Sequence, residues 1–185
     1  GEGRAGSMML APGGDPTQDA ALRLEALTAV GALRPADAAD PLLDLLSEAS
    51  PTIRAGALRA LARVDADAFL AGVGGSVPAR EWTVRAEQAT ALAGVSPAHG
   101  GPLLTTMLKD GDQRVIPSVL NAVVTLRTPG LETVLLEHLK AEDAVIRAAA
   151  ANGLGALKAA GALKPLAEAY EAWQRDALYT ATAAA

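Results

Sequence analysis

The sequence predicts an all-α fold, a right-handed α-solenoid of about five 31-residue helical hairpins followed by a final helix. Three observations lead to this prediction: a composition suited to closely packed helices, an apolar pattern that repeats along the chain, and helical spacing within each repeat. One hairpin cannot bury its own apolar face, so the pattern favours hairpins stacked on their neighbours.

The composition favours helices in close contact. Half of the 185 residues are hydrophobic, 43 are alanine and only 3% are aromatic. A core of this kind suits helix–helix packing and suits a β-sandwich poorly. The chain has no cysteine, which excludes disulfides, thiolate catalysis and cysteine-based zinc sites. The net charge of −5 argues against a general nucleic-acid binder, and residues 1–50 carry all of it.

The repeat is defined by a column of residues 31 positions apart, here called the register positions: Arg23, Arg54, Arg85, Ile116 and Arg147. The residue before each of them is aliphatic, and the residues 7, 10, 19 and 23 positions after each are apolar. This register predicts one solenoid domain over residues 17–185, with repeats at 19–49, 50–80, 81–111, 112–142 and 143–173 and a partial sixth at 174–185. We expect residues 1–16 to be disordered or cloning-derived.

Each repeat has the spacing of two helices. One apolar stripe runs from Ile146 to Leu157 and a second from Leu163 to Tyr170, with a turn at Lys158–Gly161 between them. Helix N-caps are expected at Ser50, Glu81, Asp112, Asp143 and Gln174. Pro41 and Pro102 suit the first turn of a second helix.

Two repeats depart from the pattern. Pro117 follows the register position of the fourth repeat, so we expect that helix to kink or to start late. Three glycines and Pro78 fall within residues 68–78, which predicts a shortened, bent or mobile second helix in repeat two.

The segment Asp143–Leu157 resembles the Asp-x-x-Val-Arg-x-x-Ala-x-x-x-Leu-Gly pattern of HEAT-like repeats, particularly the phycobilisome-lyase type, and Pro51–Leu58 and Trp82–Ala86 repeat it. The resemblance implies the solenoid fold and says little about function, because such solenoids serve many partners. More weakly, Leu166–Ala181 is similar to the HEAT-repeat region of bacterial multidomain cyclophilin-type prolyl isomerases. That likeness implies an accessory segment whose catalytic domain lies outside this chain.

The sequence offers no constellation of catalytic residues. His99 in a turn and His138 on a helix lack metal-ligand spacing, and Ser96 with His99 lacks an orienting acid. The carboxylate pairs at 65 and 67 and at 142 and 143 are explained by helix capping. We expect no enzyme, cofactor or metal site in this chain, and leave isomerase activity of a longer parent protein open.

In HEAT-like solenoids the second helices line a concave groove, which makes their outward positions candidate partner-binding residues: Asp40, Asp44, Thr106, Lys109, Thr133, Glu137, Lys140, Lys164, Glu168 and Glu171. Asp40 and Asp44 make one end acidic, which favours a protein or peptide partner with a basic end; a merely solvated face is the alternative. Trp82 and Trp173 are the best single anchors if exposed, and otherwise pack over repeat junctions.

The register arginines have two interpretations, a basic ladder for an anionic polymer or a structural column that pairs with acids of neighbouring repeats, and we favour the second. The predicted function is a non-catalytic protein-interaction or domain-positioning scaffold. Its partner is a protein, a peptide or a catalytic domain of the same parent chain, with no nucleic acid and no membrane. The compartment is left open between cytoplasm, the default, and a secreted or periplasmic location after signal-peptide removal.

Overall fold

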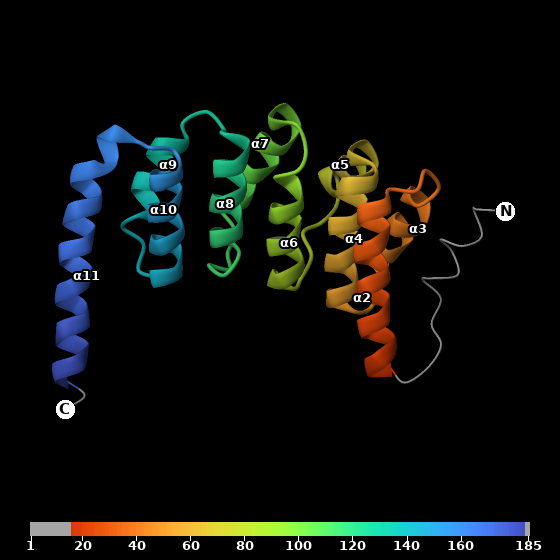
Figure 1. The fold of residues 1–185 in the computed structure, drawn as a ribbon, viewed down its shortest axis with the longest axis horizontal. Coiled ribbons are helices and arrows are strands. Elements are labelled where there is room, and N and C mark those ends of the chain that lie inside the picture. The colour runs from red at the N-terminus through yellow and green to blue at the C-terminus, as the bar shows by residue number, and fades with distance from the viewer. Residues whose placement is uncertain (1–15, 184–185) are drawn as a thin grey trace.

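The computed structural model describes the backbone of residues 16–183 and the side chains of residues 19–174. Every regular element in that range is a helix, which confirms the all-α prediction (Figure 1). The elements are α2 (Pro16–Leu33), α3 (Ala39–Asp44), η1 (Leu45–Ser47), α4 (Pro51–Val64), α5 (Ala66–Gly74), α6 (Trp82–Leu92), α7 (Pro97–Met107), α8 (Ile116–Leu126), α9 (Leu131–His138), α10 (Ala144–Ala156), η2 (Ala160–Ala162) and α11 (Leu163–Ala183). The expectation for residues 1–15 lies outside the described residues.

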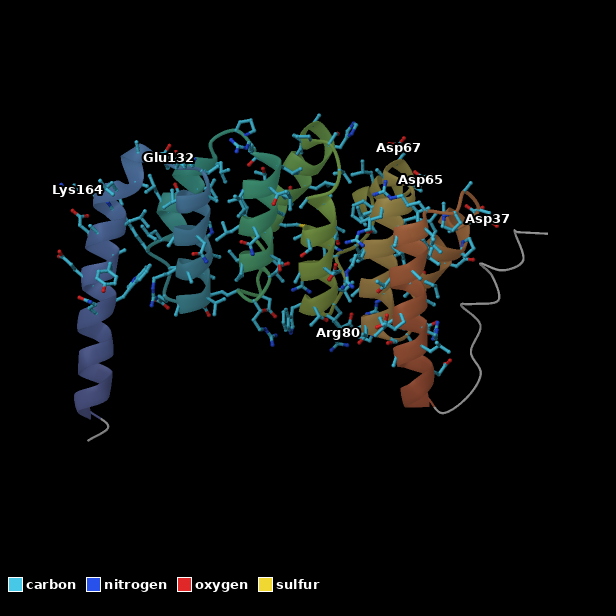
Figure 2. The ribbon with its side chains drawn as sticks, viewed as in Figure 1. Asp37, Asp65, Asp67, Arg80, Glu132 and Lys164 are labelled. Atoms are coloured by element: carbon cyan, nitrogen blue, oxygen red, sulfur yellow. The ribbon has the colours of Figure 1, made fainter. Side chains whose placement is uncertain are left out.

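Five of the helices form a row. Each of α2, α4, α6, α8 and α10, called the row helices here, packs against the next one in that order (Figure 1). The intervening helices α3, α5, α7 and α9 each pack against one or two row helices, and α11 stands at the end of the row. Asp65, between α4 and α5, and Arg80, between α5 and α6, lie at opposite ends of the helices in Figure 2. The chain therefore turns alternately at the two ends of the row helices.

The core follows the predicted apolar columns. The residues seven positions after each register position are all buried: Val30, Leu61, Leu92, Val123 and Leu154. Burying one such side chain is worth about 1.5–3 kcal/mol, so these columns hold neighbouring row helices together. Four members of the other columns are exposed instead: Leu22, Leu33, Val77 and Tyr170. Leu22 and Leu33 lie on α2, the first row helix, and Tyr170 lies on α11, so within residues 16–183 neither end of the row has a second neighbour to cover them.

Three of the five predicted N-caps lie at the N-cap position of a helix. The Ser50 hydroxyl accepts the Ile53 N–H, and the Asp143 carboxylate accepts those of Val145 and Ile146. Glu81 occupies the N-cap position of α6 but makes no capping hydrogen bond from its side chain. Asp112 is not an N-cap, because α8 begins only at Ile116. The late start, three residues after the corresponding point in α4, α6 and α10, is the effect expected of Pro117.

The fifth predicted cap, Gln174, was placed wrongly. α11 runs without a break from Leu163 to Ala183, so Gln174 lies inside a helix and residues 174–183 do not begin a separate one. Its amide Nε2 donates to the Tyr170 hydroxyl at 2.7 Å, a contact one turn back along the same helix. The stretch from Leu166 to Ala183 contains no glycine or proline, so nothing local ends the helix there.

Helix α7 also differs from expectation. His99 and Pro102 were placed in a turn and in the first turn of a helix, but α7 begins at Pro97, so both lie within it. Gly100 allows this, because a Cβ there would lie 2.8 Å from Leu126 Cδ1 and 3.0 Å from the Leu92 carbonyl oxygen. Pro41 does lie in the first turn of α3, as predicted.

The second helix of repeat two forms in spite of its glycines. α5 covers Ala66–Gly74 and the Asp65 carboxylate caps it by accepting the N–H groups of Asp67 and Ala68. The helix ends at Gly74 with Gly75 as its C-cap, so Val77, the repeat's last apolar-column residue, is left 90% exposed. No helix within residues 16–183 is long and apolar enough to cross a membrane.

Candidate functional site

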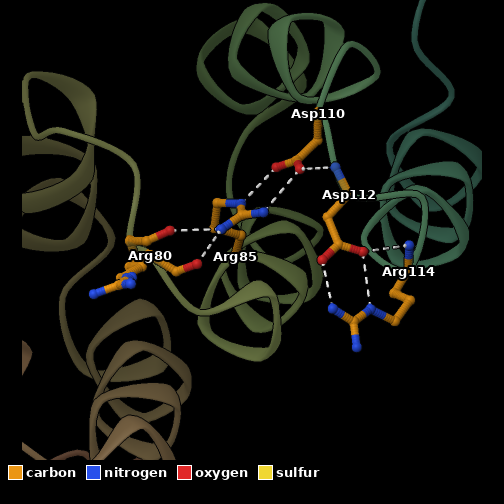
Figure 3. Close-up of polar contacts among 6 residues, drawn as sticks. Arg80, Arg85, Asp110, Asp112 and Arg114 are labelled. Atoms are coloured by element: carbon orange, nitrogen blue, oxygen red, sulfur yellow. Dashed lines mark hydrogen bonds and ion pairs between the residues drawn. The ribbon is translucent and has the colours of Figure 1, made fainter.

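Three of the register arginines, Arg54, Arg85 and Arg147, tie their row helix to the link that precedes it. Nη1 of Arg85 donates to the carbonyl oxygens of Ala79 and Arg80, at 2.6 and 2.9 Å (Figure 3). Nη1 of Arg54 makes the same pair of bonds to the carbonyls six and five residues before it, and so does that of Arg147. The repetition arises because the register places each arginine on the first turn of its helix, directed back at the link.

Three of the arginines also reach the next link along the chain. Arg85 forms a bidentate pair with Asp110, Nε to Oδ2 at 2.6 Å and Nη2 to Oδ1 at 2.9 Å (Figure 3). Arg23 pairs with Glu48 at 3.0 Å, and Arg54 pairs with Glu81. These acids lie 25–27 residues after their arginine. Arg54 and Arg85 therefore each join their own link to the next one, an arrangement called the arginine clamp here. All three arginines pair with acids, as the structural interpretation expects, but by the predicted repeat bounds only Glu81 lies in a neighbouring repeat, whereas Glu48 and Asp110 lie in the same repeat as their arginine.

The clamp at Arg85 is the most enclosed. The side chain of Arg85 is 14% exposed and that of Asp110 is 9% exposed. The hydrogen bonds from Arg85 hold the pKa of the Asp110 carboxyl below its usual range, and they raise the pKa of Arg85 in turn. A charged pair so little exposed is screened weakly by solvent, and we expect it to matter more for stability than the surface pairs.

The fourth repeat has no clamp, because its register position is Ile116, and a different cluster takes its place. Arg114 forms a bidentate pair with Asp112, which lowers the pKa of that carboxyl to about 2 (Figure 3). The guanidinium of Arg114 also lies 4.7 Å from the centre of the Trp82 ring. Trp82 therefore packs across a junction between row helices, the second of the two roles expected for it.

The fifth register arginine lacks a carboxylate. The residues 25 and 27 positions after Arg147 are Ala172 and Gln174, and in the described part of the chain no acid pairs with it. The Trp173 ring lies 5.5 Å from its guanidinium carbon instead. Its Nε atom is buried and has no hydrogen-bond partner.

Three pockets open between consecutive helices that are not in the row. The first, of about 440 Å³, lies between η1 and α5, with Arg54 in its wall; the second, of about 710 Å³, lies between α5 and α7, with Arg85 in its wall. The third, of about 590 Å³, lies between α9 and α11, with Arg147 in its wall. Each of these three pockets thus has one register arginine in its wall, Arg54, Arg85 or Arg147, and all three lie along one side of the row helices.

All ten predicted groove residues are exposed. The structure brings four of them to the third pocket, Thr133, Glu137, Lys140 and Glu168, and two to the second, Thr106 and Lys109. The other four line none of these three pockets: Asp40, Asp44, Lys164 and Glu171. The sequence analysis missed Arg147 as a pocket residue, although the absence of an acid 25–27 positions later was a signal for it.

The candidate catalytic groups stay isolated. Ser96 Oγ and His99 Nδ1 lie 2.9 Å apart, but both residues are exposed and no acid among the described residues orients the ring. Nδ1 of His138 donates to the Val134 carbonyl oxygen at 2.8 Å, within its own helix. Among the residues that the structure describes, no cluster of three or more His, Asp or Glu could hold a metal ion.

These observations define the class of the protein as all-helical. No family model matches the chain, and no curated protein matches it. One solved structure that matches is described as the crystal structure of an engineered protein, a Northeast Structural Genomics Consortium target. It is 19% identical, the match covers 92% of this chain and 86% of that chain, and the TM-score is 0.53. At that identity the likeness concerns the fold alone.

Proposed function

We propose that the chain is a right-handed solenoid of HEAT-like hairpins that acts as a non-catalytic scaffold, holding a protein or peptide partner or a neighbouring domain. The recurrence of pockets, between η1 and α5, between α5 and α7 and between α9 and α11, is the observation that carries this proposal. A side that presents several concave sites along its length suits an extended partner, because each site then contributes one contact.

The arginine clamps support the solenoid part of the proposal. They link successive loops by the same contacts at a separation of 25–27 residues, which is the behaviour of a repeated unit rather than of an irregular helical domain. The resemblance of Asp143–Leu157 to the HEAT-like pattern adds to this. An accessory role beside a cyclophilin-type domain stays a prediction.

Photo-cross-linking in the source cells tests the proposed side. A benzoylphenylalanine at Thr106 or Thr133, both exposed on intervening helices and lining pockets, should capture a partner of defined mass. Thr52 and Thr83 are matched controls, because they are exposed threonines near the start of row helices α4 and α6. Equal adducts at all four positions, or none at any, would contradict the proposal.

A further inference from the structure

The pocket between α9 and α11 contains a guanidinium with one unused hydrogen-bonding edge. Nη1 of Arg147 is occupied by the carbonyl oxygens of Ala141 and Glu142, at 2.9 and 2.7 Å. Within the described residues neither Nε nor Nη2 of Arg147 donates a hydrogen bond, and Nε is buried. A buried donor without an acceptor is costly, so this edge favours any ligand that supplies one.

Other arginines of the chain show what fills that edge. Arg59, Arg85 and Arg114 each direct Nε and Nη2 at the two oxygens of one carboxylate, at 2.6–2.9 Å. Arg85 is the closest parallel to Arg147, because its Nη1 also holds two link carbonyls and its carboxylate comes from a loop. The planar fork of a guanidinium matches a carboxylate in this side-on arrangement.

The contact between Arg147 and Trp173 does not satisfy the edge. The Trp173 ring, 5.5 Å away, engages the guanidinium through the π-system of the indole, whereas the N–H groups lie in the guanidinium plane. Trp173 belongs to the wall of the pocket, together with Leu136, Leu139, Pro165 and Ala169. A ligand here would meet an apolar wall beside the charged group.

The acids that line the same pocket do not neutralise Arg147. Glu168 contacts Lys164, at 3.8 Å, and Glu137 forms no ion pair with any described residue. Lys140 lines the pocket as a second cation. Arg147 is therefore the register arginine whose counter-charge must come from elsewhere.

From this we infer that the α9–α11 pocket binds an aspartate or glutamate side chain of a peptide segment, held by the Nε–Nη2 edge of Arg147. The inference deepens the proposed function, because it gives the chemistry of the partner segment that binds at the α9–α11 pocket. It rests on the proposed function only for the assumption that a partner supplies this segment. The segment is acidic, whereas the sequence analysis favoured a basic one for the Asp40–Asp44 end.

The chain supplies its own probe. A blocked peptide that copies residues 107–114 carries Asp110 and its neighbour Asp112 in the loop that fills the Arg85 edge. We expect it to bind the purified chain in isothermal titration and to shift the Arg147 Nε–H signal in nitrogen-15 NMR. The matched peptide with Asp110→Asn and Asp112→Asn should bind at least about tenfold more weakly, since it offers no charged acceptor.

Three protein variants complete the test. Arg147→Gln should weaken binding at least about tenfold, whereas Arg63→Gln, which alters an exposed arginine on α4, should leave it unchanged. Ala172→Glu keeps Arg147 and places an acid in the pocket wall, 25 residues after it, as Asp110 follows Arg85. The Ala172→Glu variant should shift the Arg147 Nε–H signal in the absence of peptide and should abolish peptide binding. This variant tests the inference even where Arg147→Gln fails to fold.

Equal affinity for the acidic and amide peptides overturns the inference, and so does the absence of binding and of any Arg147 shift at millimolar peptide. The peptide assay uses the purified chain and no cellular partner, so it can fail while the cross-linking at Thr106 and Thr133 succeeds. That outcome would contradict the carboxylate site and would still support the scaffold function.

Discussion

Replacing Arg85 by methionine should destabilise the fold far more than the same replacement of Arg59. Arg85→Met removes four hydrogen bonds, two to link carbonyls and two to Asp110, and leaves a carboxylate of 9% exposure with the Asp112 N–H as its remaining protein donor. Loss of one partner from an enclosed pair costs about 3–5 kcal/mol. Arg59 makes an equally well-formed pair with Glu87, both bonds at 2.8 Å, but is 45% exposed, so Arg59→Met should cost about 1 kcal/mol or less.

Urea unfolding followed by circular dichroism at 222 nm measures both losses. The variant Arg85→Met with Asp110→Leu should recover part of the first loss, because it no longer buries an unpaired charge. Equal midpoints for the Arg85→Met and Arg59→Met variants would refute the idea that enclosure, rather than pairing geometry, sets the strength of the clamp.

Three further outcomes follow from the structure. The pKa of Asp110 is lower in the folded than in the unfolded chain, so the carboxylate stabilises the fold above the unfolded pKa near 4. This stabilisation is lost as the pH falls through the lower folded pKa. Between pH 5 and 2 the urea midpoint should therefore fall less in the Asp110→Asn variant than in the wild type. Gly155→Ala should raise stability by about 0.5–1 kcal/mol, because nothing lies near the added Cβ. Gly153→Ala should gain nothing or lose about 1–3 kcal/mol, because its Cβ would lie 2.9 Å from both Leu135 and Val124. Thermal melts compare the two variants. Asp143→Ala should cost about 1 kcal/mol through its lost cap, whereas Gln174→Ala should cost nothing in the same melts, and an equal loss at Gln174 would indicate a helix boundary there.

The row of helices was predictable because burial imposes a period on the sequence. The apolar residue seven positions after each register position is buried in all five repeats, and a 31-residue period in such positions leaves few alternatives to stacked helices. The prediction was wrong at the start of α7, where residues typical of a turn also allow close packing of a helix. The segment Ser96–Gly101, with Pro97 and two glycines, suggested a turn, whereas Gly100 serves close packing against Leu126.

The sequence predicted which column of arginines forms the clamps, but it did not predict which acids these arginines pair with. The acids nearest in sequence to Arg23, Arg85 and Arg147 are Glu25, Glu87 and Asp143, and in the described part of the chain none of them forms an ion pair with its register arginine. Glu87 pairs with Arg59 instead, and Asp143 caps α10. The actual partners lie 25–27 residues away, on links whose position depends on where each intervening helix ends. A sequence pattern gives the period of such contacts, whereas the reach of each side chain depends on the folded links.

The missing clamp at Ile116 has a mechanical consequence. Arg54 and Arg85 each bind two successive links. Among the described residues no arginine joins the link at Asp110 to the link at Ala141, because Arg147 binds only the link at Ala141 that precedes it. Among the row helices, the chain stretched along the row should therefore yield first between α8 and α10, where no clamp of the described residues adds to the apolar contact. A row that is stiff from α2 to α8 and more compliant beyond it would let α10 and α11 change their angle relative to the rest of the row.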